Sequence, residues 1–385
     1  MEHFLFFRSD TMRRGMGWRI LLSGLLVFGL AWAEACKAEE AIAWAIEPRF
    51  GWAKDFAANG LAAVMVKSKG WGYWGYINKR GEEVIPPRFL WARDFAANGL
   101  AAVEVGGKFG YINTRGEEVI APHFNVAGDF AANGLAVVNV KSKAGYIYGY
   151  INKQGEEVIA PRFDLADDFA VNGLARVKVG GRYGYINERG EEVIAPRFND
   201  AGAFANGLAR VMVKDKRGLQ WGYINERSEE VIPLRFGWAE DFAANGLAAV
   251  EVKGKGWSYI NERGEEVIPP HPRFGWAEAF AANGLARVEV GGKYGYINER
   301  GKEVIPPRFD MAYDFTANGL ARVKVGSKYG YINERGEEVI VPRFENAGDF
   351  TANGLAVVGM KGKFGYIRAP EKYRADKPQT GNSPQ

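Results

Sequence analysis

The sequence has very little cysteine and histidine. Among its 385 residues there is one cysteine, Cys36, and there are three histidines: His3, His123 and His271. A single cysteine cannot form an intrachain disulfide, and His123 and His271 have no Cys or His neighbour at the spacing of a zinc site. A nucleophile–histidine pair for covalent catalysis has equally little support. We therefore expect no bound metal, no cofactor and no enzymatic activity.

An excess of charge of one sign is also missing. Lys plus Arg number 50 and Asp plus Glu number 46, which gives a net charge of +4. The two signs are mixed throughout, without the basic stripe of a nucleic-acid-binding protein. The longest apolar run, Ile20 to Trp32, has thirteen residues and is too short for an ordinary membrane-spanning helix. We expect no nucleic-acid partner, and membrane contact only through the N-terminal segment.

That segment, residues 1–38, has the three parts of a secretory signal peptide. Basic residues (Arg13, Arg14 and Arg19) precede the apolar run, and Ala33-Glu34-Ala35 fits the small-x-small cleavage rule. This predicts an exported protein of the periplasm, the cell surface or the medium, with an uncleaved anchor as the alternative. Cys36 directly follows the cleavage point, where a lipoprotein carries its acylated cysteine. Lipidation of Cys36 is a second alternative, although Ala33-Glu34-Ala35 is a poor lipobox.

Glycine and aromatic residues are abundant, with 50 glycines and 14% aromatics, and they recur in a fixed order. Three short motifs, N-G-L, G-Y-I and P-R-F, repeat along the chain, and successive copies are spaced by about 35 residues, as between Asn98 and Asn133. The N-G-L motifs begin at Asn59, Asn98, Asn133, Asn172, Asn206, Asn245, Asn283, Asn318 and Asn353. A repeat of this length determines the architecture, because one unit cannot bury its apolar face alone.

One copy, Leu174 to Phe198, predicts three β-strands. Residues 174–179 alternate in polarity, as a half-buried strand does. Gly180-Gly181 predicts a tight turn, residues 183–187 form the second strand, and a third begins at Glu191 and ends near Pro196. The first, third and fifth copies have eight residues instead of four before G-Y-I. An even-numbered extension lengthens a hairpin without exchanging its faces.

The motif G-L-A-x-V-x-V-x-x-K-(Y/F/W)-G-Y-I-N-x-x-G-E-E-V-I-x-P-R-F resembles the bacterial WG-containing repeat family over most of the chain. Trp74-Gly75 and Trp221-Gly222 preserve the pair that gives the family its name. The resemblance implies an all-β repeat protein but hardly implies a function. We predict a lead-in at 39–48, nine three-stranded units at 49–367 in an open superhelical stack, and a disordered tail at 368–385. A closed β-propeller is the alternative.

Two sets of repeated acidic residues are predicted to be structural. The Glu-Glu pairs, such as Glu82-Glu83, follow a turn in most units, whereas a glycosidase needs one pair in one cleft. The seven aspartates of the A-x-D-F motifs are expected to form Asx-type turns or caps: Asp55, Asp94, Asp129, Asp168, Asp241, Asp314 and Asp349.

One position indicates a surface. Two residues after each P-R-F phenylalanine the chain has Trp four times, but also Asp200 and Asn346. A core position would hardly accept both kinds of residue, so the four tryptophans, Trp52, Trp91, Trp238 and Trp276, are candidate binding residues. Alternatively, their rings only cover the seam between repeats. The expected function is a non-enzymatic binding or scaffolding surface of the bacterial cell envelope, with an envelope protein or glycan as partner. A lectin-like, multivalent carbohydrate binder is the alternative.

Overall fold

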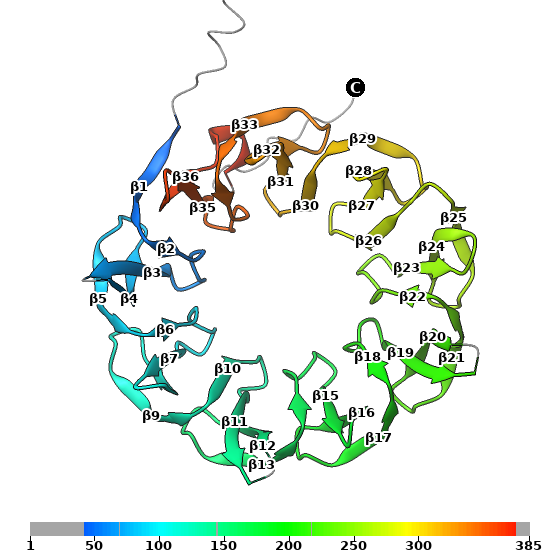
Figure 1. Ribbon diagram of the computed structural model, residues 1–385, viewed down its shortest axis with the longest axis horizontal. Helices are drawn as coiled ribbons and strands as arrows, with labels where there is room; N and C mark the ends of the chain where they lie inside the picture. The colour runs from blue at the N-terminus through cyan, green and yellow to red at the C-terminus, as the bar shows by residue number, and fades with distance from the viewer. Residues whose placement is uncertain (1–41, 69, 144, 217, 375–385) are drawn as a thin grey trace, which may run out of the picture. The chain divides into compact units, whose positions relative to one another are not determined.

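The computed structural model describes residues 42–68, 70–143, 145–216 and 218–374, and a compact unit begins at Ala43. The predicted signal peptide and Cys36 lie outside the described residues. Within the compact unit, nine four-stranded antiparallel sheets follow one another around a closed ring (Figure 1). The fold is a nine-bladed β-propeller. The predicted open stack of three-stranded units was therefore wrong, and the closed alternative is correct.

The first five blades are made of these strands: β2 (Trp52–Ala53), β3 (Leu61–Ser68), β4 (Trp71–Asn78) and β5 (Glu83–Phe89) in blade 1; β6 (Trp91–Ala92), β7 (Ala101–Val105), β8 (Lys108–Ile112) and β9 (Glu118–Phe124) in blade 2; β10 (Val126–Phe130), β11 (Ala136–Ser142), β12 (Gly145–Ile151) and β13 (Glu157–Phe163) in blade 3; β14 (Leu165–Ala166), β15 (Leu174–Val179), β16 (Arg182–Asn187) and β17 (Glu192–Phe198) in blade 4; β18 (Asp200–Ala201), β19 (Leu208–Asp215), β20 (Gly218–Asn225) and β21 (Glu230–Phe236) in blade 5.

The remaining blades are made of these strands: β22 (Trp238–Ala239), β23 (Leu247–Val252), β24 (Gly256–Asn261) and β25 (Glu266–His271) in blade 6; β26 (Trp276–Phe280), β27 (Leu285–Val290), β28 (Lys293–Asn298) and β29 (Glu303–Phe309) in blade 7; β30 (Met311–Phe315), β31 (Leu320–Val325), β32 (Lys328–Asn333) and β33 (Glu338–Phe344) in blade 8; β34 (Asn346–Ala347), β35 (Leu355–Met360), β36 (Lys363–Arg368) and β1 (Trp44–Phe50) in blade 9. A short 3-10 helix, η1 (Glu371–Tyr373), follows.

The strand that closes the ring is β1. It pairs with β36 as the outermost strand of blade 9, with Phe50 opposite Phe364. The last repeat lacks the G-E-E-V-I segment that would supply its own outer strand, and the segment expected as a lead-in supplies this strand instead. The expected tail also differs, since Arg368 still belongs to β36 and Glu371–Tyr373 are helical. Residues 375–385 lie outside the described residues.

Each seam between blades repeats one set of contacts. The tyrosine of G-Y-I, or of S-Y-I in blade 6, is fully buried, and its hydroxyl donates to the carbonyl of the residue that follows the buried alanine of the next blade's inner strand, as from Tyr76 to Arg93 O at 2.7 Å. The same ring packs on the next blade's Phe95, with centroids 4.7 Å apart. All nine seams have this pair of contacts, donated by Tyr76, Tyr111, Tyr150, Tyr185, Tyr223, Tyr259, Tyr296, Tyr331 and Tyr366. Tyr366 donates to Lys54 O, so the closing seam is built like the others.

The glycine before this tyrosine is required by a close approach of two strands. A Cβ on Gly75 would lie 2.4 Å from Ile85 O and 2.7 Å from Pro87 N. Here the outer strand β5 bulges, since Tyr76 pairs with Ile85 and Trp74 with Phe89. Blade 6 has Ser258 at this position. Its hydroxyl donates to Ile268 O at 2.8 Å, and its outer strand ends at His271, just before the inserted Pro272.

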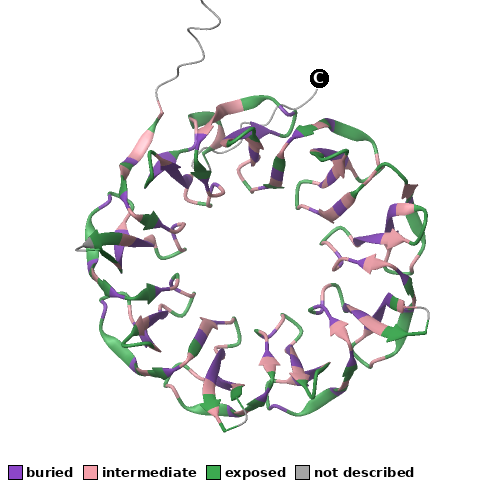
Figure 2. Cartoon of the chain, in the orientation of Figure 1, coloured by how far each residue is buried: buried purple, intermediate pink, exposed green. Residues whose placement is uncertain are grey.

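The two faces of the ring carry different loops. We call the hairpin face the one with the turns that join the second and third strands, such as residues 66–73. The NGL face carries the N-G-L loops, such as residues 59–61, and the turns before the outer strands, such as residues 78–82. The pairing of Trp52 with Met65 places the start of each inner strand near the hairpin face. In Figure 2, buried residues lie inside the blades, and exposed residues lie on the outer strands and in the turns and loops.

The hairpin predictions are confirmed. Gly180 and Gly181 have φ angles of 57° and 79°, as a tight two-residue turn requires. In the long hairpins the aromatic residue keeps its place, since Trp74 pairs with Met65 as Tyr183 pairs with Lys178 in a short one.

Removal of β1 should destabilise the ring. Ile46 and Phe50 are each 5% exposed, and burying two such side chains stabilises by about 3–6 kcal/mol. We expect a chain that starts at Gly51 to unfold at clearly lower denaturant concentration than one that starts at Ala43. Amides of β36 should also exchange faster with solvent. Equal stability of the two chains would contradict closure through β1.

Candidate functional site

The inner strands present the most variable residues of the repeat to the centre of the ring. Each begins with the variable position, continues with a buried alanine, and leads to a buried phenylalanine, through A-x-D-F in seven blades and through A-x-A-F in blades 5 and 7. Because backbone pairing and the alanine are constant, these strands hold different side chains at equivalent places. The inner wall is therefore where one blade can differ from another without disturbing the fold.

The four candidate tryptophans begin β2, β6, β22 and β26. Trp52 and Trp91 are 49% and 42% exposed, while Trp238 and Trp276 are half-buried. Each ring packs on the aromatic residue that precedes G-Y-I, or S-Y-I in blade 6, in the preceding blade, at centroid distances of 4.7 to 5.3 Å. The partners are Phe364, Trp74, Trp221 and Trp257. The tryptophans thus cover the seams, and each keeps part of its surface in solvent.

Two of the candidates form a larger cluster. Trp238 and Trp276 lie 5.9 Å apart and connect Trp221 with Trp257, so four indoles follow one another across blades 5, 6 and 7. Carboxylates orient two of them, since Trp238 Nε1 donates to Glu240 Oε1 at 2.7 Å and Trp276 Nε1 donates to Glu278 Oε1 at 3.0 Å. We call these four rings the tryptophan cluster.

Cations lie over the tryptophans. The Arg210 guanidinium is 5.4 Å from the Trp221 ring and 6.0 Å from the Trp238 ring. In blades 1 and 2, Lys54 Nζ is 5.1 Å from the Trp91 ring and 5.7 Å from the Trp74 ring. Such contacts contribute about 0.5–1 kcal/mol at exposed sites. The aromatic surface is thereby combined with hydrogen-bond donors.

A hollow of about 570 Å³ lies along the inner wall of blades 2 to 6. It is lined by charged residues of both signs together with Val126 and Tyr148. Val126 is blade 3's equivalent of the candidate tryptophans, so the variable position borders this hollow. The charged residues in its wall are Arg93, Asp129, Asp167, Asp168, Arg176, Arg210 and Asp241.

Three of the repeated aspartates, Asp129, Asp168 and Asp241, line this hollow instead of forming turns as we expected. Turns are made by asparagines instead: Asn78 Oδ1 accepts from the amides of Arg80 and Glu82, and Asn59 Oδ1 accepts from Leu61. The asparagines precede positive-φ glycines at the ends of the strands, whereas each aspartate comes one residue before the buried phenylalanine of an inner strand. The aspartates therefore lie close to one another around the ring.

Arginine neutralises only part of this acidic wall. Four blades have Arg at the third position of L-A-x-V, where it reaches the next inner strand. Arg210, for example, donates to Ala239 O at 2.8 Å and to Asp241 Oδ1 at 2.9 Å. The other three are Arg176, Arg287 and Arg322. At the seams from blade 9 to blade 4 the same position is apolar: Val357, Ala63, Ala102 and Val137.

Burial raises the pKa of several of these carboxyl groups. The pKa of Asp55 rises to about 6, first because it is buried and then because Asp349 and Asp94 lie near it. Burial likewise raises the pKa of Asp94 and Asp168. By contrast, the exposed turn carboxylate Glu82 has a lowered pKa, because Asn78 and Arg80 donate hydrogen bonds to it.

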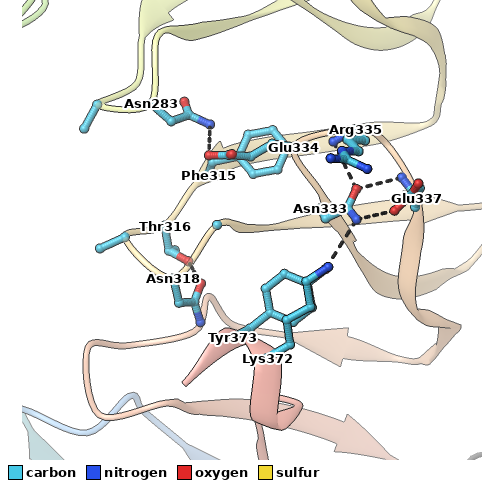
Figure 3. A pocket seen from close by; sticks show the side chains of 13 residues that line it. Asn283, Phe315, Thr316, Asn318, Asn333, Glu334, Arg335, Glu337, Lys372 and Tyr373 are labelled. Carbon is cyan, nitrogen blue, oxygen red and sulfur yellow. Dashed lines mark hydrogen bonds between the residues drawn. The ribbon is translucent and has the colours of Figure 1, made fainter. Parts of the chain in front are cut away.

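A second hollow, of about 580 Å³, lies on the NGL face of blades 7 and 8 (Figure 3). Lys372 and Tyr373 form one wall, and Asn333 Nδ2 donates to the Tyr373 hydroxyl at 3.3 Å. On the opposite side Asn283 donates to Glu334 at 3.0 Å. This hollow could not be predicted from the sequence, because one of its walls, Lys372 and Tyr373, comes from a segment without the repeat pattern.

The Glu-Glu pairs and the two histidines of the repeats make only local contacts. Glu82 accepts hydrogen bonds from Asn78 and Arg80 of its own turn, as a structural turn residue does. His123 Nδ1 lies 2.7 Å from Ala121 O, and His271 stacks on Phe274. Within the described ranges, no group of three or more His, Cys, Asp or Glu residues could hold a metal ion. Likewise, no described helix has the length and apolar character that a membrane crossing requires.

The blade geometry and the W-G pairs define the class as a repeat β-propeller. The WG-containing repeat family matches nine consecutive segments: 43–69, 74–109, 109–143, 148–183, 183–216, 221–255, 257–294, 294–329 and 329–364. The chain belongs to the WG-containing repeat family.

The chain is similar to several solved structures at low sequence identity. A eukaryotic initiation factor is 12% identical, with a TM-score of 0.55 over 74% of this chain and 86% of that chain. BamB from Moraxella catarrhalis is 10% identical, with a TM-score of 0.40 over 76% and 98% of the two chains. The V. cholerae biofilm matrix protein Bap1 is 11% identical, with a TM-score of 0.36 over 87% and 92%. No curated protein sequence matches significantly.

Asp55 should make stability depend on pH. Its pKa is about 6 in the folded chain against 3.8 ordinarily, so between these values the folded state binds more protons and stability falls as pH rises. We expect Asp55→Asn to raise the free energy of unfolding by roughly 2 kcal/mol at pH 8 and by little at pH 4. Denaturant unfolding at both pH values measures this.

The control is Glu82→Gln, which removes a carboxylate whose pKa is lowered and should not stabilise the protein at pH 8. An equal gain from Asp55→Asn at both pH values would show that charge is not the cause.

Proposed function

We propose that this protein is an exported, non-enzymatic binding platform of the bacterial cell envelope. Its ligand would be held at the inner wall near the hairpin face. The observation that supports this most is the tryptophan cluster, where four indoles, two of them oriented by Glu240 and Glu278, lie beside Arg210. Partly exposed aromatic rings with adjacent polar groups are typical of binding sites.

The proposed export depends on the N-terminal segment. Arg13, Arg14, the apolar run and Ala33-Glu34-Ala35 support cleavage before Cys36. If the full-length gene is expressed in a bacterium, N-terminal sequencing should find Cys36 first, or a blocked N-terminus that incorporates labelled palmitate if this cysteine is lipidated. An unprocessed protein in the cytoplasm would contradict export.

The binding role can be tested in the producing cell. A photo-crosslinking amino acid at position 52, near the hairpin face, should give a specific product. The same residue at position 79, in an exposed turn on the NGL face of the same blade, serves as the control. Identical products from both positions, or none from position 52, would contradict a ligand at the inner wall.

A carbohydrate ligand is the second candidate, and the arrangement of the tryptophan cluster favours it. Sugar rings present C–H groups to aromatic faces and hydroxyls to charged groups, and indoles alternate here with Glu240, Glu278 and Arg210. Several seams repeat the motif with different neighbours, which would give several non-identical subsites.

We predict that W238S/W276S abolishes binding on an array of bacterial envelope glycans, because it removes both exposed faces of the tryptophan cluster. The matched control is V126S/M311S, which changes the same position in blades 3 and 8, where the side chains are 40% and 39% exposed. Melting temperatures of all variants are measured in parallel. If W238S/W276S binds normally but unfolds at a much lower temperature, these rings serve only the seams.

A further inference from the structure

Three blades carry hairpins that are longer than the rest. In blade 2 the pairing of the second and third strands ends at Val105 with Lys108. In blade 1 it continues for two further pairs, ending at Ser68 with Trp71. Two residues add about 7 Å to a strand. The tips of blades 1, 3 and 5 therefore extend beyond the short hairpins of blades 2 and 4 on the hairpin face.

Large apolar side chains are exposed on these three tips. Trp71 is 72% exposed, Tyr146 is 54% exposed and Leu219 is 47% exposed. Each comes from the residues that the insertion adds, so none is needed to maintain the repeat. Burial in a seam explains why large apolar side chains occur at Trp74 and Trp221, which are 5% and 3% exposed. It does not explain the apolar side chains of the three tips.

Lysines accompany the apolar residues. Two cross-strand pairs join them directly, Lys141 with Tyr146 and Lys214 with Leu219. Lys67 has the equivalent place in blade 1, opposite Gly72. The only acidic residue of segments 66–73, 140–147 and 213–220 is Asp215. Exposed lysines on the described parts of the tips are Lys67, Lys141, Lys143, Lys214 and Lys216.

We propose that the three tips bind the ring, hairpin face first, to the surface of an anionic phospholipid bilayer. Tryptophan and tyrosine are favoured at the membrane interface, and lysines beside them bind anionic headgroups. A projection of about 7 Å matches the depth to which interfacial segments enter the headgroup region, about 5–10 Å. This interaction goes beyond the binding platform and does not depend on it.

The arrangement favours a flat surface over a linear polyanion. The tips are separated by blades 2 and 4, whose short hairpins end in Gly106-Gly107 and Gly180-Gly181. The basic residues therefore form three separate groups and not a continuous track. Three separate projections on one face can contact a plane together, whereas a nucleic-acid strand requires a continuous basic groove.

The charge contribution is tested with vesicles. The chain from Lys37 onward, which contains all 36 strands, is sedimented with phosphatidylcholine vesicles with and without phosphatidylglycerol. We expect binding only to the anionic vesicles, and weaker binding in high salt. In K67E/K141E/K214E the partition coefficient should fall about a hundredfold, since each lysine near an anionic surface contributes roughly a factor of five.

The matched control reverses three charges in the same blades on the opposite face. K79E/K153E/R227E changes exposed residues of the NGL face and gives the same net charge as the first variant. It should bind within about twofold of the wild type, because these residues lie a blade height away from the membrane and are screened there. An equal loss in both variants would show that only net charge matters and would overturn the docked orientation.

The apolar contribution has its own readout. Lipids with brominated acyl chains should quench tryptophan emission of the wild type, and Trp71→Phe should remove most of this quenching without weakening binding more than severalfold. W71S/Y146S/L219S should bind at least tenfold more weakly with an unchanged melting temperature. The proposal is overturned if the wild type ignores anionic vesicles, if quenching persists in Trp71→Phe, or if a soluble polyanion such as heparin binds while vesicles do not.

Discussion

The fold depends on one contact that is repeated at every seam. A buried tyrosine donates its hydroxyl to the next blade's inner strand and packs its ring on that blade's phenylalanine, from Tyr76 and Phe95 to Tyr366 and Phe56. Because all nine seams have the same contacts, each blade is expected to meet the next at about the same angle. A constant angle closes the ring only for a particular number of blades, and here β1 completes the ninth. The W-G pair serves the same seam: the aromatic residue covers it, and the glycine lets the outer strand bulge close to it.

Much of the fold could be predicted from the sequence, because every repeat shows the same pattern of strand and turn residues. The alternation in residues 174–179 and the glycines after it gave the two central strands and their turn. The fourth strand was missed because β14, for example, has only two residues, Leu165 and Ala166, too few for a period to be visible. Closure was only the alternative to an open stack, although Pro48-Arg49-Phe50 precedes the first N-G-L motif. A P-R-F without its own repeat is the outer strand of a blade whose other strands lie at the far end of the chain.

The candidate site was only partly predictable, because contacts across a seam are not encoded by spacing within one repeat. Variation at one offset made Trp238 and Trp276 candidates, but it gave no sign of their ring partners Trp221 and Trp257, which come from preceding blades. The aspartates were expected to form Asx-type turns or caps. In the structure the asparagine already makes that turn, so the aspartate is left on the inner wall. The pKa of Asp55 is raised first by its burial and then by the nearby carboxylates of Asp349 and Asp94.

The hairpin face carries two features at different heights, the three projecting tips and the tryptophan cluster. The tips with Trp71, Tyr146 and Leu219 belong to blades 1, 3 and 5. The tryptophan cluster lies in blades 5 to 7, below the level of the projecting tips. Of these blades, 6 and 7 have short hairpins. If the tips enter a headgroup layer, the cluster stays about 7 Å above them, which leaves room for a sugar ring or a headgroup between Trp238, Trp276 and the bilayer. Binding at the cluster would then be confined to ligands displayed at a membrane surface. The two roles remain separable, because no tip residue is part of the cluster: loss of vesicle binding in the tip variants would leave binding of a soluble glycan unchanged.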